Sequence, residues 1–182
     1  MLGVTGRTLV DIRRMNAVLL PLPAAATSFT DFVPERACAE IRHSWHDVAF
    51  SRAYRNVAVG FDGPDFINLV LGFTTPQPLE AVIARLHAIE TQCGRPRFAP
   101  KWASRTMDLD VLLFGDRVEK TAEYTLPRPD LLKRPFMLGP LAEIAPDVMH
   151  PTAHKTIGQL WAAFDRDAHS MVPVDLALPS GA

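Results

Sequence analysis

The segment 66–114 constrains the fold of this chain more than any other. Its first part, Phe66 to Phe73, is a run of large apolar residues that is typical of a buried central strand. Two prolines then introduce a helix over Leu79 to Cys93, and a glycine ends it. Asp108 to Phe114 starts with alternating acidic and apolar residues and then becomes wholly apolar, which predicts a second strand entering the core.

Shorter patterns on either side complete the order of elements. They predict strands at Ala17 to Leu20 and Asp47 to Tyr54, and helices at Asp31 to His43, Met137 to Ile144 and Thr156 to Phe164. The resulting order, strand–helix–strand–strand–helix–strand, is typical of a ferredoxin-like α+β sandwich. We therefore expect a mainly antiparallel sheet with helices packed on one face.

A length of 182 residues suits one compact domain and leaves little room for a second. Residues 1–15 show no clear periodicity, so we expect a loose N-terminal arm, with Met15 as a second candidate start. Residues 16–170 then form the single domain, and residues 171–182 form a C-terminal tail.

Composition excludes several classes of protein. A net charge of −1 argues against a nucleic-acid partner, whose binding needs a basic surface. The two cysteines have no spacing typical of a disulfide framework or a zinc site. The run AVLLPLPAAA superficially resembles a signal peptide, but it is short, two prolines interrupt it, and a buried strand is the preferred interpretation. No apolar run could span a bilayer, so we expect a cytoplasmic protein without a membrane partner.

The sequence Asp108-Leu109-Asp110 is the sharpest chemical signal. On a strand, residues two apart project to the same side, so both carboxylates stand together while Leu109 turns into the core. Mg²⁺ prefers one or two carboxylates together with substrate phosphates, and it would relieve the repulsion between the two acids. A solvated strand end without metal is the ordinary alternative.

Cations precede this acid pair in the proline-rich loop that leads to the strand: Arg95, Arg97, Lys101 and Arg105. Guanidinium groups facing a metal-binding acid pair are what a polyphosphate requires. A solvated basic loop is the alternative. The chain has neither GxxxxGK[ST] nor GxGxxG, so a bound nucleotide would depend on these side chains for its phosphates.

Three further residues each have two interpretations. Trp102 could stack on an adenine or on an arginine, or serve as a half-buried anchor. Asn68 interrupts an apolar strand, and its amide could hydrogen-bond the edge of a heterocycle or be satisfied by the backbone. Phe66 shares the face of Asn68 and could stack on a planar ring or belong to the core.

Together these residues resemble a known family. The run KWASRTMDLDVLLFG, from Lys101 to Gly115, resembles the signature of the 6-hydroxymethyl-7,8-dihydropterin pyrophosphokinases, which act in folate biosynthesis. The similarity continues through DFINLVLGF, IETQCGRPR and RPFMLGPLAEIAPDVMHP, in the order of the family. It covers about residues 47–165.

This resemblance implies the ferredoxin-like fold, ATP as co-substrate, two Mg²⁺ ions and a hydroxymethyl-pterin that attacks the β-phosphorus of ATP and releases AMP. A monomer is expected. By resemblance, Asp108 and Asp110 hold the metal and, with Arg95 and Arg105, carry the catalysis. The nucleotide side is implied to include Glu90, Arg97, Lys101, Trp102, Val111 and Arg134. The pterin side is implied to include Val59, Phe66, Asn68 and Phe136.

Several positions depart from the family pattern. LLPLPAAATS replaces the usual glycine–serine–asparagine turn, NVAVGFDGPD lacks a threonine–proline pair, and Arg128-Pro129 replaces a histidine and an aromatic residue. Lys101 stands where arginine is common, and phenylalanine replaces tyrosine at position 66. Two alternatives to the active pterin enzyme therefore stay open: a relative that binds nucleotide or pterin without efficient catalysis, and a diphosphokinase for another hydroxymethyl heterocycle.

Overall fold

The computed structural model describes residues 6–15, 29–56, 66–93, 108–165 and 171–175. They form an α+β fold built on a six-stranded sheet with the order β5-β1-β4-β3-β8, in which β2 also pairs with β4 and every pair is antiparallel. A two-stranded hairpin, β6-β7, forms a second, separate sheet. The elements are β1 (Gly6–Met15), α1 (Phe29–Ser44), β2 (Ala49–Phe50), β3 (Ala53–Asn56), β4 (Phe66–Thr75), α2 (Leu79–Gln92), β5 (Asp108–Phe114), β6 (Glu119–Lys120), β7 (Thr125–Leu126), α3 (Pro135–Ile144), α4 (Ile157–Ala162) and β8 (Val172–Val174).

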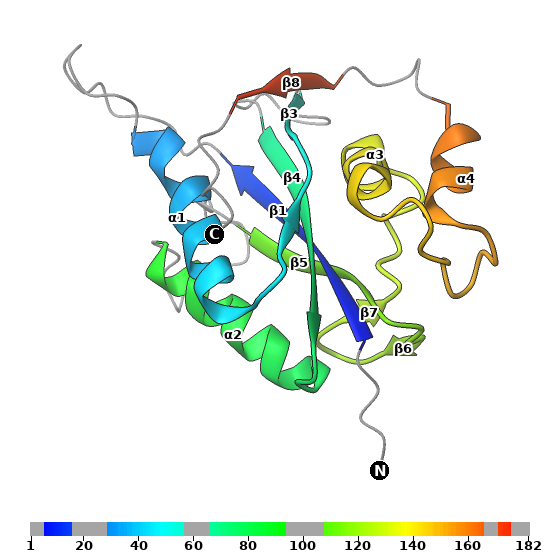
Figure 1. Ribbon diagram of the computed structural model, residues 1–182, viewed down its shortest axis with the longest axis horizontal. Helices are drawn as coiled ribbons and strands as arrows, with labels where there is room; N and C mark the ends of the chain where they lie inside the picture. The colour runs from blue at the N-terminus through cyan, green and yellow to red at the C-terminus, as the bar shows by residue number, and fades with distance from the viewer. Residues whose placement is uncertain (1–5, 16–28, 57–65, 94–107, 166–170, 176–182) are drawn as a thin grey trace.

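Helices cover both faces of the sheet (Figure 1). Strand β4 shows why: Leu69, Leu71 and Phe73 pack with α1 and α2, whereas Val70 packs with α3 and its neighbours. The expectation that helices cover only one face is therefore wrong, because β4 is apolar on both sides and each side requires a covering layer. Among the described residues, no helix combines the length and the apolar character needed to cross a membrane.

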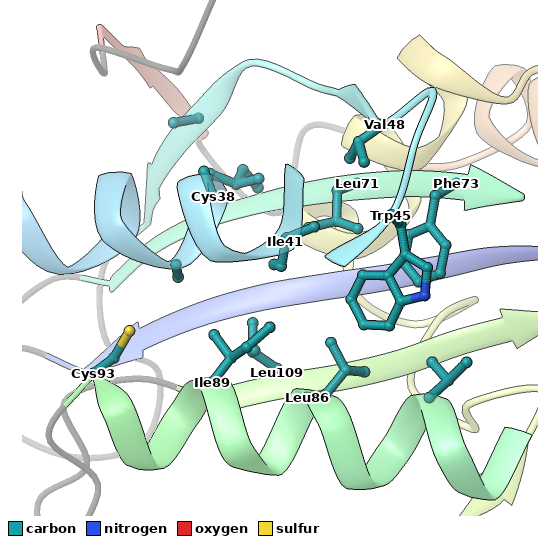
Figure 2. Close-up of a cluster of buried hydrophobic side chains, with 14 residues drawn as sticks. Cys38, Ile41, Trp45, Val48, Leu71, Phe73, Leu86, Ile89, Cys93 and Leu109 are labelled. Atoms are coloured by element: carbon teal, nitrogen blue, oxygen red, sulfur yellow. The ribbon is translucent and has the colours of Figure 1, made fainter. Parts of the chain in front are cut away.

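The core between α1, α2 and the sheet contains large side chains from all three (Figure 2). Trp45, just after α1, stacks on Phe73 of β4 with ring centroids 4.2 Å apart. Ile41 and Leu86 approach from the two helices and are 0% and 1% exposed. This packing fixes α2 over β4 and β5, and thereby places the end of α2 beside the start of β5.

The strand and helix predictions that rest on clear periodicity are confirmed. The bounds of β5 match the prediction, and those of α2 differ by one residue. The strand predicted at Asp47 to Tyr54 is divided into β2 and β3. Ser51 causes the division, because its hydroxyl accepts a hydrogen bond from the Val70 N–H while its own N–H donates to the Val70 carbonyl.

The N-terminal arm and the C-terminal tail both need correction. Gly6–Met15 form β1, which pairs with β4 on one side and β5 on the other, so the arm is not loose over these residues. In the tail, Val172–Val174 form β8 against β3. Hydrogen bonding to neighbouring strands stabilises both segments, and their own sequences carry little strand pattern. The strand predicted at Ala17 to Leu20 lies outside the described residues.

A polar cluster joins β3 to α3. Glu143 accepts hydrogen bonds from the Tyr54 hydroxyl and from the Arg52 guanidinium, the latter at 2.9 Å. Burial, followed by the bond to Glu143, raises the pKa of Tyr54 to about 12, so its hydroxyl stays protonated and donates at neutral pH. Because Tyr54 lies opposite Asn68 in the sheet, this cluster holds α3 over the face that carries Asn68.

Candidate active site

The acid pair lies on β5, on the face turned away from α1 and α2. Asp108 is the first residue of the strand and Asp110 the third, and both are partly exposed. Leu109 between them is 5% exposed and packs in the core with α2. The alternation of a strand thus projects both carboxylates to one side, as predicted.

Glu90 connects this part of β5 to α2. Its side chain is buried, and its Oε1 accepts a hydrogen bond of 2.8 Å from the Leu109 backbone N–H, between the two aspartates. A buried carboxylate that binds a backbone N–H makes a strong, charge-assisted bond. The observed contact of Glu90 therefore fixes the strand that presents the acid pair.

Replacement of Glu90 by leucine is expected to lower the free energy of unfolding by about 2 kcal/mol, because it leaves the buried Leu109 N–H without its acceptor. Glu90→Gln keeps an acceptor oxygen and should lose less. Chemical denaturation measures the stability, and amide hydrogen exchange should show faster exchange at Leu109. Glu80→Leu, in the exposed first turn of the same helix, is the control. Unchanged stability of Glu90→Leu would contradict the role assigned to this bond.

Arg128 also reaches the acid pair, and it was not among the predicted site residues. Its Nη1 lies 2.8 Å from Asp110 Oδ1. Its backbone N–H donates to the Leu112 carbonyl at 3.0 Å, which brings the segment after β7 alongside β5. The sequence showed only a departure from the family pattern at this position, because the contact spans 18 residues and depends on how the chain returns to β5.

A pocket of about 120 Å³ opens beside the acid pair. Ligand sites for whole drug-sized molecules measure roughly 300–1,000 Å³, so this volume suits one ring or group of a larger ligand. Asp110 and Arg128 both line it, and the rest of its wall comes from α2, β5 and the β6–β7 hairpin: Ile83, Leu86, His87, Leu109, Val111, Glu123, Tyr124, Thr125 and Leu126.

Asn68 lies on the same face of the sheet as the acid pair. Arg13 of β1 is the register partner of Asn68 on one side and of Asp108 on the other. Residues directly opposite one another project to the same face, so Asn68 and Asp108 stand in one row, about 10 Å apart across two strand spacings. Asn68 is 1% exposed, and neither its Nδ2 nor its Oδ1 has a hydrogen-bond partner among the residues that the structure describes.

An unpaired buried amide is uncommon and costs free energy. Asn68 offers donors and an acceptor on a face that also carries carboxylates, so it is suited to bind the polar edge of a planar ligand. The alternative considered from the sequence was an amide satisfied by the backbone, and the described backbone supplies no such hydrogen bond.

The other predicted residues are only partly described. Val111 is half-buried and lines the pocket. Arg134 precedes α3, where its carbonyl accepts from the Met137 and Leu138 N–H groups. Phe136 is half-buried against the core beneath α3, and Phe66 is the first residue of β4. Six predicted residues lie outside the described part of the chain: Val59, Arg95, Arg97, Lys101, Trp102 and Arg105.

The donor set fits magnesium held together with a phosphate ligand. Asp108 and Asp110 supply two carboxylates on one face, and no group of three or more His, Cys, Asp or Glu is placed to hold a metal among the residues that the structure describes. Mg²⁺ keeps several waters and binds through one or two carboxylates plus substrate phosphates. The site therefore suits a metal that arrives with its substrate.

Residues 27–146 match the model of the family described as 7,8-dihydro-6-hydroxymethylpterin-pyrophosphokinase (HPPK). Two relatives are named 2-amino-4-hydroxy-6-hydroxymethyldihydropteridine pyrophosphokinase. The one from Synechocystis is 44% identical over 111 residues, which cover 59% of this chain and 54% of the relative. The one from Aquifex aeolicus is 37% identical over 109 residues, which cover 59% of this chain and 67% of the relative. The match thus spans between about half and two thirds of these relatives.

Solved structures of wild-type Plasmodium falciparum HPPK-DHPS are similar in fold. One has a TM-score of 0.61 at 11% identity and covers 87% of this chain and 44% of that protein. Another, with pteroate, has a TM-score of 0.60 at the same identity and covers 87% of this chain and 44% of that protein. At this identity the likeness supports the fold alone.

Proposed function

The chain belongs to the 7,8-dihydro-6-hydroxymethylpterin pyrophosphokinase family, and from this membership we propose that it transfers the β,γ-diphosphate of ATP to 6-hydroxymethyl-7,8-dihydropterin and releases AMP. The product would enter folate biosynthesis. Names of the relatives from Synechocystis and Aquifex aeolicus support the reaction.

One observation carries the proposal: a carboxylate pair and a buried amide that is unpaired among the described residues share one face of the sheet, and a ring-sized pocket opens beside the pair at the edge strand β5. Asp110 belongs to both the acid pair and the pocket. Asp108 stands in the same cross-strand row as Asn68. A nucleotide in the pocket and a heterocycle at Asn68 would therefore lie on either side of the acid pair, where a transferred phosphate has to pass.

Asp108 and Asp110 would hold two Mg²⁺ ions together with the phosphates of ATP. When bound, the metal would neutralise charge on the phosphate oxygens and so make the β-phosphorus accessible to a nucleophile. The two aspartates keep a fixed position for this metal because Leu109 between them packs in the core and donates its N–H to Glu90. Catalysis of this type depends on positioning and electrostatics more than on a general base.

The remaining predicted residues divide between the two substrates. On the pterin side, Asn68 binds the polar edge of the ring, with Phe66 and Phe136 stacked on its faces and Val59 beside it. On the nucleotide side we place Val111 at the pocket and Glu90 behind β5. The phosphates and the adenine are bound by Arg95, Arg97, Lys101, Trp102, Arg105 and Arg134.

The reaction is a single displacement at phosphorus. A bond forms between the pterin hydroxymethyl oxygen and the β-phosphorus, while the bond from the β-phosphorus to the α,β-bridging oxygen breaks. AMP leaves with that oxygen, and the hydroxyl proton passes to solvent. The hydrogen bonds of Asn68 hold the pterin so that its hydroxymethyl group faces the acid pair.

We propose further that the sheet and helices form a ferredoxin-like sandwich. The chain would act in the cytoplasm as a monomer, without a nucleic acid or a membrane as partner.

A substrate panel tests this function. We expect AMP release that requires Mg²⁺ and 6-hydroxymethyl-7,8-dihydropterin together, at a rate far above that with ATP alone. AMP release with a different hydroxymethyl heterocycle only would overturn the assigned substrate and keep the reaction type. Mg²⁺-dependent ATP binding without AMP from any heterocycle in the panel would overturn the enzyme and favour a binding protein.

A further inference from the structure

Arg128 is held against the acid pair from two directions. Its N–H donates to the Leu112 carbonyl, and its own carbonyl accepts from the Leu131 N–H at 3.1 Å. Its guanidinium Nη1 contacts Asp110 Oδ1 at 2.8 Å, and the two side chains are 26% and 27% exposed. The backbone hydrogen bonds therefore fix the position of the Arg128 main chain, and the ion pair fixes the position of its guanidinium.

The guanidinium is only partly satisfied by this pair. Its Nε is buried and has no hydrogen-bond partner in the described part of the chain. A guanidinium presents several donors in a planar fork, which matches a phosphate or carboxylate at two points. Because Arg128 and Asp110 both line the ring-sized pocket, an anion brought by a ligand in that pocket would lie within reach of the same fork.

We propose that Arg128 is an internal counter-cation that couples the metal and nucleotide sites, an inference that rests on the proposed function. Without nucleotide, Arg128 neutralises Asp110 and competes with a divalent cation for Oδ1. With nucleotide, a phosphate takes over the guanidinium, satisfies the orphaned Nε and leaves Asp110 to the metal. Phosphate and metal thereby help each other to bind, and the coupling is reciprocal.

Electrostatics favours replacement of the Arg128–Asp110 ion pair when phosphate and metal bind. A guanidinium and a divalent cation at one carboxylate oxygen repel each other, so each weakens the binding of the other. A triphosphate is a stronger and better-matched partner for the guanidinium than a single carboxylate. The pair is partly exposed, so breaking it costs about 1 kcal/mol or less, which a phosphate can offset.

Two binary affinities test the coupling directly. Calorimetry measures Mn²⁺ binding in the absence of nucleotide, and α,β-methylene-ATP binding in the presence of EDTA. In Arg128→Gln we expect Mn²⁺ to bind about threefold more tightly, because the competing cation is gone. The metal-free nucleotide analogue should bind about tenfold more weakly, because a charge-assisted contact is lost. Shifts of opposite sign are the signature, since a merely structural Arg128 would weaken both.

Three controls fix the interpretation. Arg117→Gln makes the same charge change at a cation that contacts Glu80 and Glu119, so it should shift neither affinity. Arg128→Lys should leave Mn²⁺ binding close to wild type and weaken the analogue by an intermediate factor, because lysine keeps the charge without the fork. Asp110→Asn should abolish most Mn²⁺ binding, which would show that the Mn²⁺ measured binds at Asp110.

Shifts of the same sign in Arg128→Gln, no shift, or Mn²⁺ binding that survives Asp110→Asn would overturn the inference. Those results would leave the proposed function intact if the wild type still forms AMP with the pterin. Conversely, opposite shifts in a protein that forms no AMP would support the coupling and contradict the diphosphokinase.

Discussion

Replacement of Asp108 or Asp110 by asparagine is expected to lower the turnover number for pterin-dependent AMP formation about 10³-fold. A bound metal contributes several kcal/mol of transition-state stabilisation, and each variant removes one of the two carboxylates that hold it. Asparagine has nearly the same shape, and both aspartates are partly exposed on β5, so the fold should change little. Steady-state rates at saturating ATP and pterin measure the loss.

Asp116→Asn is the matched control, because it removes an exposed carboxylate from the turn directly after the same strand. Its rate should stay within about twofold of wild type, as expected for a surface change away from the site. Raising the Mg²⁺ concentration should recover part of the activity of the Asp108 and Asp110 variants. Wild-type rates in both variants would show that the acid pair does not hold the metal.

Asn68→Leu is expected to raise stability and to reduce activity. Leucine removes a buried amide that has no hydrogen-bond partner among the described residues, so the free energy of unfolding should rise by about 1 kcal/mol. The same change removes the group proposed to bind the pterin edge, and the KM for the pterin should rise about 100-fold, because one or two buried hydrogen bonds are lost. Chemical denaturation and the pterin dependence of AMP release measure the two effects.

Ser51→Ala provides the contrast on the neighbouring segment. Ser51 is also buried, but its hydroxyl accepts from the Val70 N–H and donates to the Arg52 carbonyl. Removing a satisfied polar group should lower stability and leave the KM for the pterin close to wild type. A destabilised Asn68→Leu with an unchanged KM would assign Asn68 to the fold and remove it from the site.

The parts of the fold that follow from local pattern were predictable from the sequence. Strand β5 and helix α2 have strong periodicity with clear end signals, so their bounds match within a residue. The alternation that turns Leu109 inward and both aspartates outward follows from the same pattern. The sequence also singled out Asn68 as an amide inside an apolar strand, although only the structure shows that no described residue pairs with the amide.

The parts that were missed depend on contacts distant in sequence. Charged residues interrupt β1, and this strand is stabilised by pairing with β4 and β5 on both of its edges. Strand β8 has three residues, and within the described residues it pairs with β3 alone. Arg128 is an isolated cation after a proline, and its role at Asp110 depends on the bond that returns the chain to β5. No local periodicity carries that information.

The most direct test of the central claim is the identity of the products, followed by ³¹P NMR in a mixture of protein, ATP, Mg²⁺ and 6-hydroxymethyl-7,8-dihydropterin. The account predicts AMP and a pterin diphosphate in equal amounts, formed only when the pterin is present. ADP with a pterin monophosphate, or AMP with free diphosphate that forms equally without the pterin, would contradict it.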